Sequence, residues 1–162
     1  MKKIQSFEGI ITKISDFDVG ANEEKGCMKL IVVNNGYGNE VHFVVKPNTY
    51  FVDQIMVKIG DNITGFYDAN VPVPMIFPPQ FQAVVMAKYM SHQDVKVDYF
   101  NEQLVSSDGR LKLNLSPNTQ VILTNGQLFT GNLTNRNLIV LYSMATMSIP
   151  AQTTPYRIIM LC

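Results

Sequence analysis

Residues 27–45 read CMKLIVVNNGYGNEVHFVV, and this stretch decides the fold class. Its first part, Cys27–Val33, is an almost unbroken apolar run, and a second run at 41–45 follows the Asn/Gly-rich segment 34–39. Two β-rich runs joined by Asn and Gly are typical of a hairpin. Because neighbouring side chains in a strand point to opposite faces, the alternation within 41–45 indicates a sheet with one inner face.

The N-terminal segment allows two interpretations. Its apolar residues have the 3-4-3 spacing of a helix face: Ile4, Phe7, Ile11 and Ile14. Gly9 and the β-branched cluster Ile10–Thr12 disfavour a helix. We therefore predict a long strand with a bulge or coil at Gly9, where the inward face switches. Apolar runs at Ile63–Tyr67 and Phe81–Tyr89 predict the remaining strands of a set of five.

The second half of the chain follows the same order. Its strands are predicted at Val95–Phe100, Leu104–Ser106, Leu111–Leu115, Leu138–Tyr142 and Arg157–Leu161. Three segments also match in order: residues 46–49 with 116–119 at an offset of 70, residues 62–67 with 137–142 at 75, and residues 81–85 with 156–160 at 75. Three matches in one order favour a duplication.

These patterns predict an all-β chain made of two tandem, small, OB-like β-barrel modules of about five strands each, packed together. We place the first repeat at residues 1–92 and the second, shorter repeat at 93–162. The helix that usually joins strands three and four of such a barrel is not expected, because residues 46–56 and 116–127 hold only turns and short runs. A single β-sandwich formed by both halves is the alternative.

Composition limits the classes of function. The 13 basic residues balance the 13 acidic ones, and neither half has the positive excess that binding to a phosphate backbone needs. The two cysteines do not suggest a disulfide framework, and no stretch approaches the 18 apolar residues of a membrane span. We expect a cytoplasmic protein with no membrane partner, unless a signal segment has been removed.

Residues 60–81, GDNITGFYDANVPVPMIFPPQF, are the most unusual part of the chain. They resemble an uncharacterised family of small OB-like β-barrel proteins from Gram-positive anaerobic bacteria, and the resemblance is strongest over about residues 40–90. The family has no assigned activity, so the resemblance implies a fold and adds no catalytic residue.

The same stretch supplies the candidate binding site. Four prolines within eight residues stiffen the connection between two predicted strands. Aromatic and polar side chains around it could form a binding surface: Phe66, Tyr67, Asp68, Asn70, Phe77, Gln80 and Phe81. The alternative is a cap, in which Val71, Met75, Ile76 and Phe77 plug the end of the barrel.

Other residues give weaker signals. The acidic run Asp16–Glu24 has four carboxylates in a loop that could hold Ca²⁺ but departs from the EF-hand pattern, so a solvated loop is the simpler interpretation. His42 and His92 have no neighbouring ligand at metal spacing, and Cys27 is expected to be a small core residue. We predict no metal and no cofactor.

The leading functional prediction is a non-enzymatic binding or assembly module that uses the Pro/aromatic loop of the first repeat. Its partner would be a protein or another surface, and a homo-oligomer is compatible with this use. The alternative is an OB-like protein that binds single-stranded nucleic acid through Tyr37, Phe43, Lys46, Tyr50 and Phe51. The balanced charge makes nucleic acid the less favoured partner.

Overall fold

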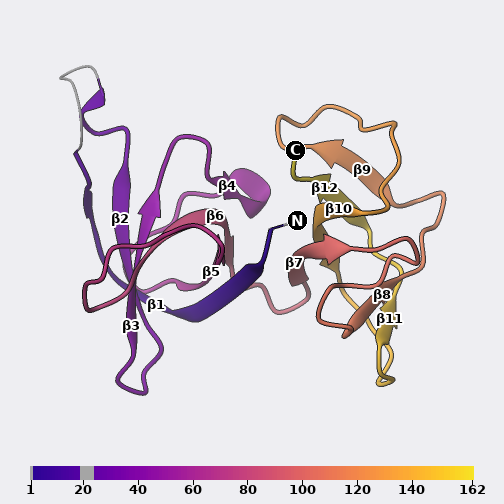
Figure 1. Ribbon diagram of the computed structural model, residues 1–162, viewed down its shortest axis with the longest axis horizontal. Coiled ribbons are helices and arrows are strands. Elements are labelled where there is room, and N and C mark those ends of the chain that lie inside the picture. Colours follow the sequence, from indigo (N-terminus) through magenta and orange to yellow (C-terminus); the bar gives the residue numbers. More distant parts are fainter. Residues whose placement is uncertain (1, 19–23) are drawn as a thin grey trace. The chain divides into compact units, whose positions relative to one another are not determined.

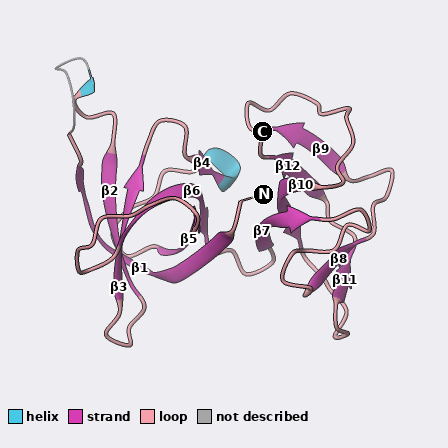
Figure 2. Cartoon of the chain, viewed as in Figure 1, coloured by secondary structure: helices cyan, strands magenta, loops and turns pink. Residues whose placement is uncertain are grey.

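The computed structural model describes residues 2–18 and 24–162, and the chain divides into two compact units (Figure 1). The first unit is Ile4–Tyr89 and the second holds Met90–Cys162. Strands dominate both units, and the prediction of an all-β fold is confirmed (Figure 2). Among the residues described, no helix has the length and apolar character needed to cross a membrane.

The first unit contains a closed five-stranded barrel. Its strands are β1 (Ile4–Asp16), β2 (Lys29–Asn34), β3 (Glu40–Val45), β5 (Asn62–Asp68) and β6 (Gln80–Lys88). They are ordered β3-β2-β1-β5-β6, and β6 pairs again with β3 in parallel, which closes the ring. A short strand, β4 (Tyr50–Phe51), and a 3-10 turn, η2 (Val52–Gln54), stand where the usual barrel has a helix. This closure has the strand order of an OB barrel.

Strand β1 is long because it belongs to both halves of the barrel. Residues 4–10 pair with β5 and residues 10–16 pair with β2. The register shift falls between Ile11 and Lys13, so the prediction of a bulge at Gly9 is wrong by about three residues. Gly9 has a different role, because a Cβ at this position would lie 2.3 Å from the backbone oxygen of Asn34. A glycine here lets the end of β2 approach β1 closely.

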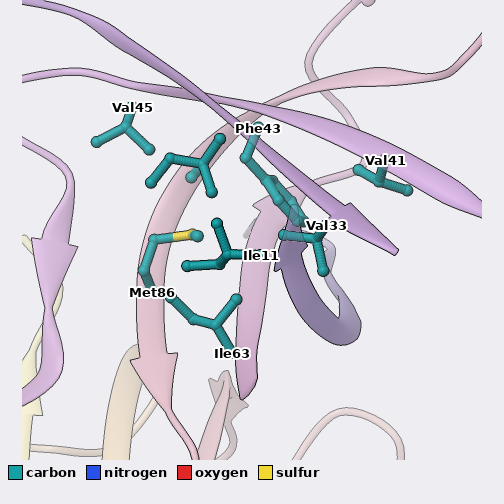
Figure 3. Close-up of a cluster of buried hydrophobic side chains, with 9 residues drawn as sticks. Ile11, Val33, Val41, Phe43, Val45, Ile63 and Met86 are labelled. Atoms are coloured by element: carbon teal, nitrogen blue, oxygen red, sulfur yellow. The ribbon is translucent and has the colours of Figure 1, made fainter. Parts of the chain in front are cut away.

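The core of the first unit fills the barrel (Figure 3). Its fully buried side chains include Ile11, Val33, Phe43, Ile63 and Met86. The ring of Phe43 lies directly over Gly65, where a Cβ would come within 2.4 Å of its Cζ atom. A large side chain and a glycine therefore share one layer of the core.

The second unit is built from shorter strands. They are β7 (Asp94–Phe100), β8 (Leu111–Leu113), β9 (Gln120–Leu123), β10 (Arg136–Tyr142), β11 (Ala151–Thr153) and β12 (Arg157–Met160). One sheet has the order β7-β10-β12-β9, and β8 pairs with β11 in parallel. The predicted strand at Leu104–Ser106 is reduced to single bridges with Phe100 and Lys112. A separate core surrounds Phe100, Leu138, Val140, Ile158 and Met160.

Both units contain a Pro-Asn-Thr turn that is held by the same contacts. The Thr49 hydroxyl accepts the Lys46 N–H at 3.0 Å and donates to the carbonyl of Ala83 at 2.9 Å. The Thr119 hydroxyl accepts the Ser116 N–H at 3.3 Å and donates to the carbonyl of Pro155 at 2.7 Å. In each unit the turn thus fastens a connector to the segment that forms the last strand.

The strand ladders correct the predicted alignment of the last strand. Ile63 of β5 pairs with Lys88, and Leu138 of β10 pairs with Met160. Met160 lies 72 positions after Lys88, as Pro155 lies 72 positions after Ala83 in the turn contacts. The offset that relates these contacts is therefore 72 and not the predicted 75. The sequence match had aligned apolar runs, which have similar composition at neighbouring registers.

Candidate functional site

Residues 69–79 connect β5 to β6 and form the β5–β6 loop, whose two ends are fixed to the barrel. At one end, Asp68 Oδ1 accepts the Asn70 N–H at 3.0 Å and the Asp68 carbonyl accepts the Val71 N–H at 3.1 Å. At the other end, the Pro79 carbonyl accepts the His42 N–H of β3 at 2.9 Å. The loop leaves the barrel and returns to it through ordered hydrogen bonds.

Two stacked aromatic rings lie at the base of the β5–β6 loop. Tyr67 and Phe81 have ring centroids 3.9 Å apart and planes within 5°, and Tyr67 also meets Phe43 at 6.3 Å. Both Tyr67 and Phe81 pack against the core of the barrel. The Tyr67 hydroxyl donates to Gln5 Oε1 at 3.4 Å, and burial raises the pKa of this phenol. The stack joins the loop's stem to the core.

The tip of the β5–β6 loop is exposed. Met75 is 103% exposed, Phe77 is 90% exposed and Ile76 is 54% exposed. Val71 and Val73 are also exposed, and the Phe77–Pro78 peptide bond is cis. The alternative in which these residues plug the end of the barrel is therefore wrong. Their side chains point to solvent, while the core is filled from the strands.

The seven predicted site residues lie along this loop and its stem, but they do not form one surface. Phe66 is buried, and Tyr67, Asp68, Gln80 and Phe81 are half-buried. Asn70 and Phe77 are exposed. Met75, which is fully exposed at the tip, is not among the seven predicted binding residues. A useful signal was present in the sequence, since no charged residue occurs between Asp68 and Lys88.

The second unit carries a loop with a similar apolar tip. Residues 143–150 connect β10 to β11 and form the β10–β11 loop, in which Met144, Met147 and Ile149 are 81%, 103% and 94% exposed. Met147 follows Met75 by 72 positions, and Ile149 follows Phe77 by the same number. The Ile149–Pro150 bond is also cis. This loop has one proline and no aromatic residue, so its likeness to the β5–β6 loop lies in the exposed apolar tip.

Two hydroxyls of the β10–β11 loop, those of Thr146 and Ser148, have hydrogen-bond partners. The Thr146 hydroxyl accepts the Gln152 N–H at 2.9 Å and lies 2.6 Å from the Ser148 hydroxyl. Ser148 Oγ donates to the Pro150 carbonyl at 2.8 Å, and Thr153 Oγ1 donates to the carbonyl of Met144. The Thr146 and Ser148 side chains are thus hydrogen-bonded although they are exposed, as are the large apolar side chains of the loop.

A shallow hollow of about 480 Å³ lies elsewhere on the first unit, beside the turn that joins β2 to β3. Asn34, Asn35 and exposed Tyr37 form one side, and Glu8 and Asn62 form part of the other. The Asn34 and Asn35 side-chain oxygens accept backbone N–H groups of the turn, at 2.8 Å to Gly36 and Tyr37. These amides shape the turn, so the hollow is weaker as a candidate site than the loops.

The residues predicted for nucleic-acid binding are not on one face. Phe43 is completely buried, and Phe51 packs against the core. Lys46 Nζ donates to Gln82 at 2.9 Å. Binding of single-stranded nucleic acid needs basic and aromatic side chains interleaved on an open face. These five residues do not form such a face.

The residues considered for metal binding have local roles. Part of the acidic run, residues 19–23, lies outside the described residues. Of the remainder, Asp16 pairs with Lys29, and Asp18 accepts the Gly26 N–H at 2.8 Å. His42 Nε2 lies 2.9 Å from Glu40. Within 2–18 and 24–162, no three His, Cys, Asp or Glu side chains gather to hold a metal.

Cys27 lies just before β2 and is exposed, so its predicted place in the core is wrong. Its strand begins two residues later, at Lys29. The apolar run therefore reaches beyond the strand that it predicted.

No family model, no curated protein and no solved structure matches the chain. The resemblance of residues 40–90 to a family of small barrel proteins therefore stays a prediction. The features of the chain that bear on function are the two loops and the contacts that hold them.

Proposed function

We propose that this chain is a non-enzymatic binding or assembly module that engages a partner surface through the β5–β6 loop. The observation that carries the proposal is the exposure of Met75 and Phe77 at the tip of a loop with both ends hydrogen-bonded to the barrel. Contiguous exposed apolar side chains on a folded domain mark interaction sites more often than isolated ones do.

The loop is suited to binding because little of it must become ordered. Pro72, Pro74, Pro78 and Pro79 each restrict the backbone, and the stack of Tyr67 on Phe81 fixes the stem. A segment that is already held in shape loses little conformational entropy when it meets a partner. Burial of the Met75, Ile76 and Phe77 side chains would then supply the favourable free energy of binding.

Tyr67 and Asp68, at the stem of the β5–β6 loop, make contacts within the first unit. The Tyr67 hydroxyl is engaged by Gln5, and the Asp68 carboxylate accepts the Asn70 N–H. These contacts hold the start of the loop in place. The positions of both groups are therefore explained by the hydrogen bonds that they make.

We further propose that the two units are copies of one module. The threonine-held turns, the offset of 72 in the last strands and the two exposed Met tips support this. One more feature recurs: Asn62 Oδ1 and Asn137 Oδ1 are both buried without a hydrogen-bond partner. The N–H of Tyr89 donates to the Asn62 carbonyl, as that of Leu161 donates to the Asn137 carbonyl, and Leu161 follows Tyr89 by 72 positions.

Site-specific photo-crosslinking tests the binding proposal. A photoreactive amino acid at position 77 is compared with the same group at position 56, because Met56 is 93% exposed in the same unit but lies outside the loop. In whole-cell extract that includes membranes, we expect adducts at position 77 and few at position 56. Equal yields at the two positions, or no adduct at 77, would refute the proposed role of the loop.

A further inference from the structure

We propose that the partner surface is a lipid bilayer, and that the β5–β6 loop and the β10–β11 loop each insert an apolar tip at its headgroup–acyl boundary. This inference rests on the proposed binding function and names the partner's chemistry. A surface contact of this kind needs apolar side chains at a protruding tip and no membrane span. The sequence-based expectation of no membrane partner was drawn from the missing span and did not address such a contact.

The first argument is the composition of the two tips. Met75, Ile76 and Phe77 in one loop and Met144, Met147 and Ile149 in the other are exposed and apolar. Each loop lies inside a long uncharged segment, residues 69–87 and 143–156. Insertion would therefore remove apolar surface from water without burying a charge.

The second argument concerns the backbone of the β5–β6 loop. Between residues 72 and 79, four of the eight positions are proline and have no N–H. A protein partner would gain from donors that it could pair with, since protein interfaces carry about one hydrogen bond per 100–200 Å². Each missing N–H is one donor fewer to remove from water, which lowers the cost of placing this loop at the headgroup–acyl boundary.

The third argument is the arrangement of the β10–β11 loop. The Thr146 and Ser148 hydroxyls are hydrogen-bonded within the loop, and the Thr153 hydroxyl of β11 donates to the Met144 carbonyl, so these three hydroxyls can keep their partners on insertion. The three exposed apolar side chains project from this hydrogen-bonded framework. Polar groups that already have partners cost less to remove from water.

The charge pattern specifies the kind of bilayer. Peripheral proteins that select anionic lipids use clusters of Lys and Arg near the surface. Neither loop contains a basic residue, and the nearest one after the β5–β6 loop is Lys88. Binding should therefore depend on exposed acyl chains and not on anionic headgroups, and it should change little with salt.

Partition into vesicles tests the proposal with the full chain. The probes are phosphatidylcholine vesicles and vesicles of phosphatidylcholine and phosphatidylglycerol in a 3:1 ratio, each at about 50 and about 500 mM salt. We expect the protein to co-sediment with both, with partition coefficients that agree within about two-fold. No co-sedimentation at several millimolar lipid, or binding only to the anionic vesicles at low salt, would overturn the proposal.

Matched variants test the two loops separately. Met75→Ser with Phe77→Ser, and Met147→Ser with Ile149→Ser, should each lower partition about ten-fold or more, because each removes two inserted side chains. The control, Met56→Ser with Ile59→Ser, removes exposed apolar side chains outside the loops and should leave partition unchanged. Circular dichroism checks folding, which exposed substitutions should preserve. Unchanged binding by either loop variant would overturn the two-loop proposal.

The two levels of proposal fail in different ways. Adducts of position 77 with a protein, together with no partition into vesicles, would overturn the lipid inference and leave the binding module intact. The absence of both adducts and partition would refute both proposals. Lipid adducts at position 77 with loop-dependent partition would support both.

Discussion

At the residue scale, Gly65 shows how one missing side chain sets the core. A Cβ at this position would lie 2.4 Å from Phe43 Cζ, and Phe43 is completely buried. We expect Gly65→Ala to lower the free energy of unfolding by about 1–3 kcal/mol through overpacking, measured by urea denaturation. Adding Phe43→Leu to Gly65→Ala should restore part of the lost stability, so the double variant should be more stable than Gly65→Ala alone. A Gly65→Ala protein as stable as wild type would show that the ring can move away.

Asp61 is the residue whose titration should affect the stability of the first unit. The Lys58 N–H donates to its carboxylate at 2.9 Å and Lys88 lies 3.4 Å away, and together they lower the pKa of Asp61. A carboxyl with a lowered pKa in the folded state stabilises the fold above its unfolded pKa of about 3.9. That contribution is lost as the pH falls through the folded pKa.

We therefore expect wild type to lose more stability than Asp61→Asn between about pH 5 and the acid limit of folding. Urea denaturation at a series of pH values measures the difference. Parallel curves for wild type and Asp61→Asn would show that the Lys58 and Lys88 contacts do not stabilise the fold.

At the element scale, the Pro-Asn-Thr turn acts through a threonine that both accepts and donates. Thr49→Val keeps the shape of the side chain but leaves the Lys46 N–H and the Ala83 carbonyl without this partner. We expect a loss of about 1–2 kcal/mol in the free energy of unfolding. Thr49→Ser keeps the hydroxyl and should retain most of the wild-type stability. The Thr64 hydroxyl reaches Glu8 on the exposed side, so Thr64→Val should change stability little. A Thr49→Val protein with wild-type stability would show that the hydrogen bonds of Thr49 do not stabilise the fold.

The elements that the sequence predicted are the long ones. β1, β2, β3, β5 and β6 were foreseen within about two residues, because apolar runs and Asn/Gly turns mark them. The strands β4, β9 and β11 were not foreseen, since two to four residues carry little periodicity. All three pair in parallel with distant segments, and that pairing comes from the tertiary fold. The sequence left two interpretations of the β5–β6 loop open for a related reason: an apolar stretch has the same composition whether it caps a core or faces solvent.

At the scale of the whole molecule, two separate cores imply two folding units. The cluster around Phe43 and Ile63 belongs to Ile4–Tyr89, and the cluster around Leu138 and Ile158 belongs to Met90–Cys162. We expect the fragments 1–89 and 90–162 each to fold when produced alone, as shown by dispersed amide resonances. The shorter fragment should be the less stable, because smaller domains bury a smaller fraction of their surface. A fragment with the spectrum of an unfolded chain would show that its core needs the other unit.

The fragments also separate one loop from the other, and this gives the duplication a measurable consequence. If both loops of one chain reach the same bilayer, the second insertion is intramolecular and its effective concentration raises overall binding. Each folded fragment should then partition into phosphatidylcholine vesicles at least ten-fold more weakly than the full chain. The two fragments mixed at equal concentration should not recover the difference, because the covalent link supplies it. Full-chain partition equal to that of the stronger fragment would show that the loops act on separate surfaces, and the second unit would then add no avidity.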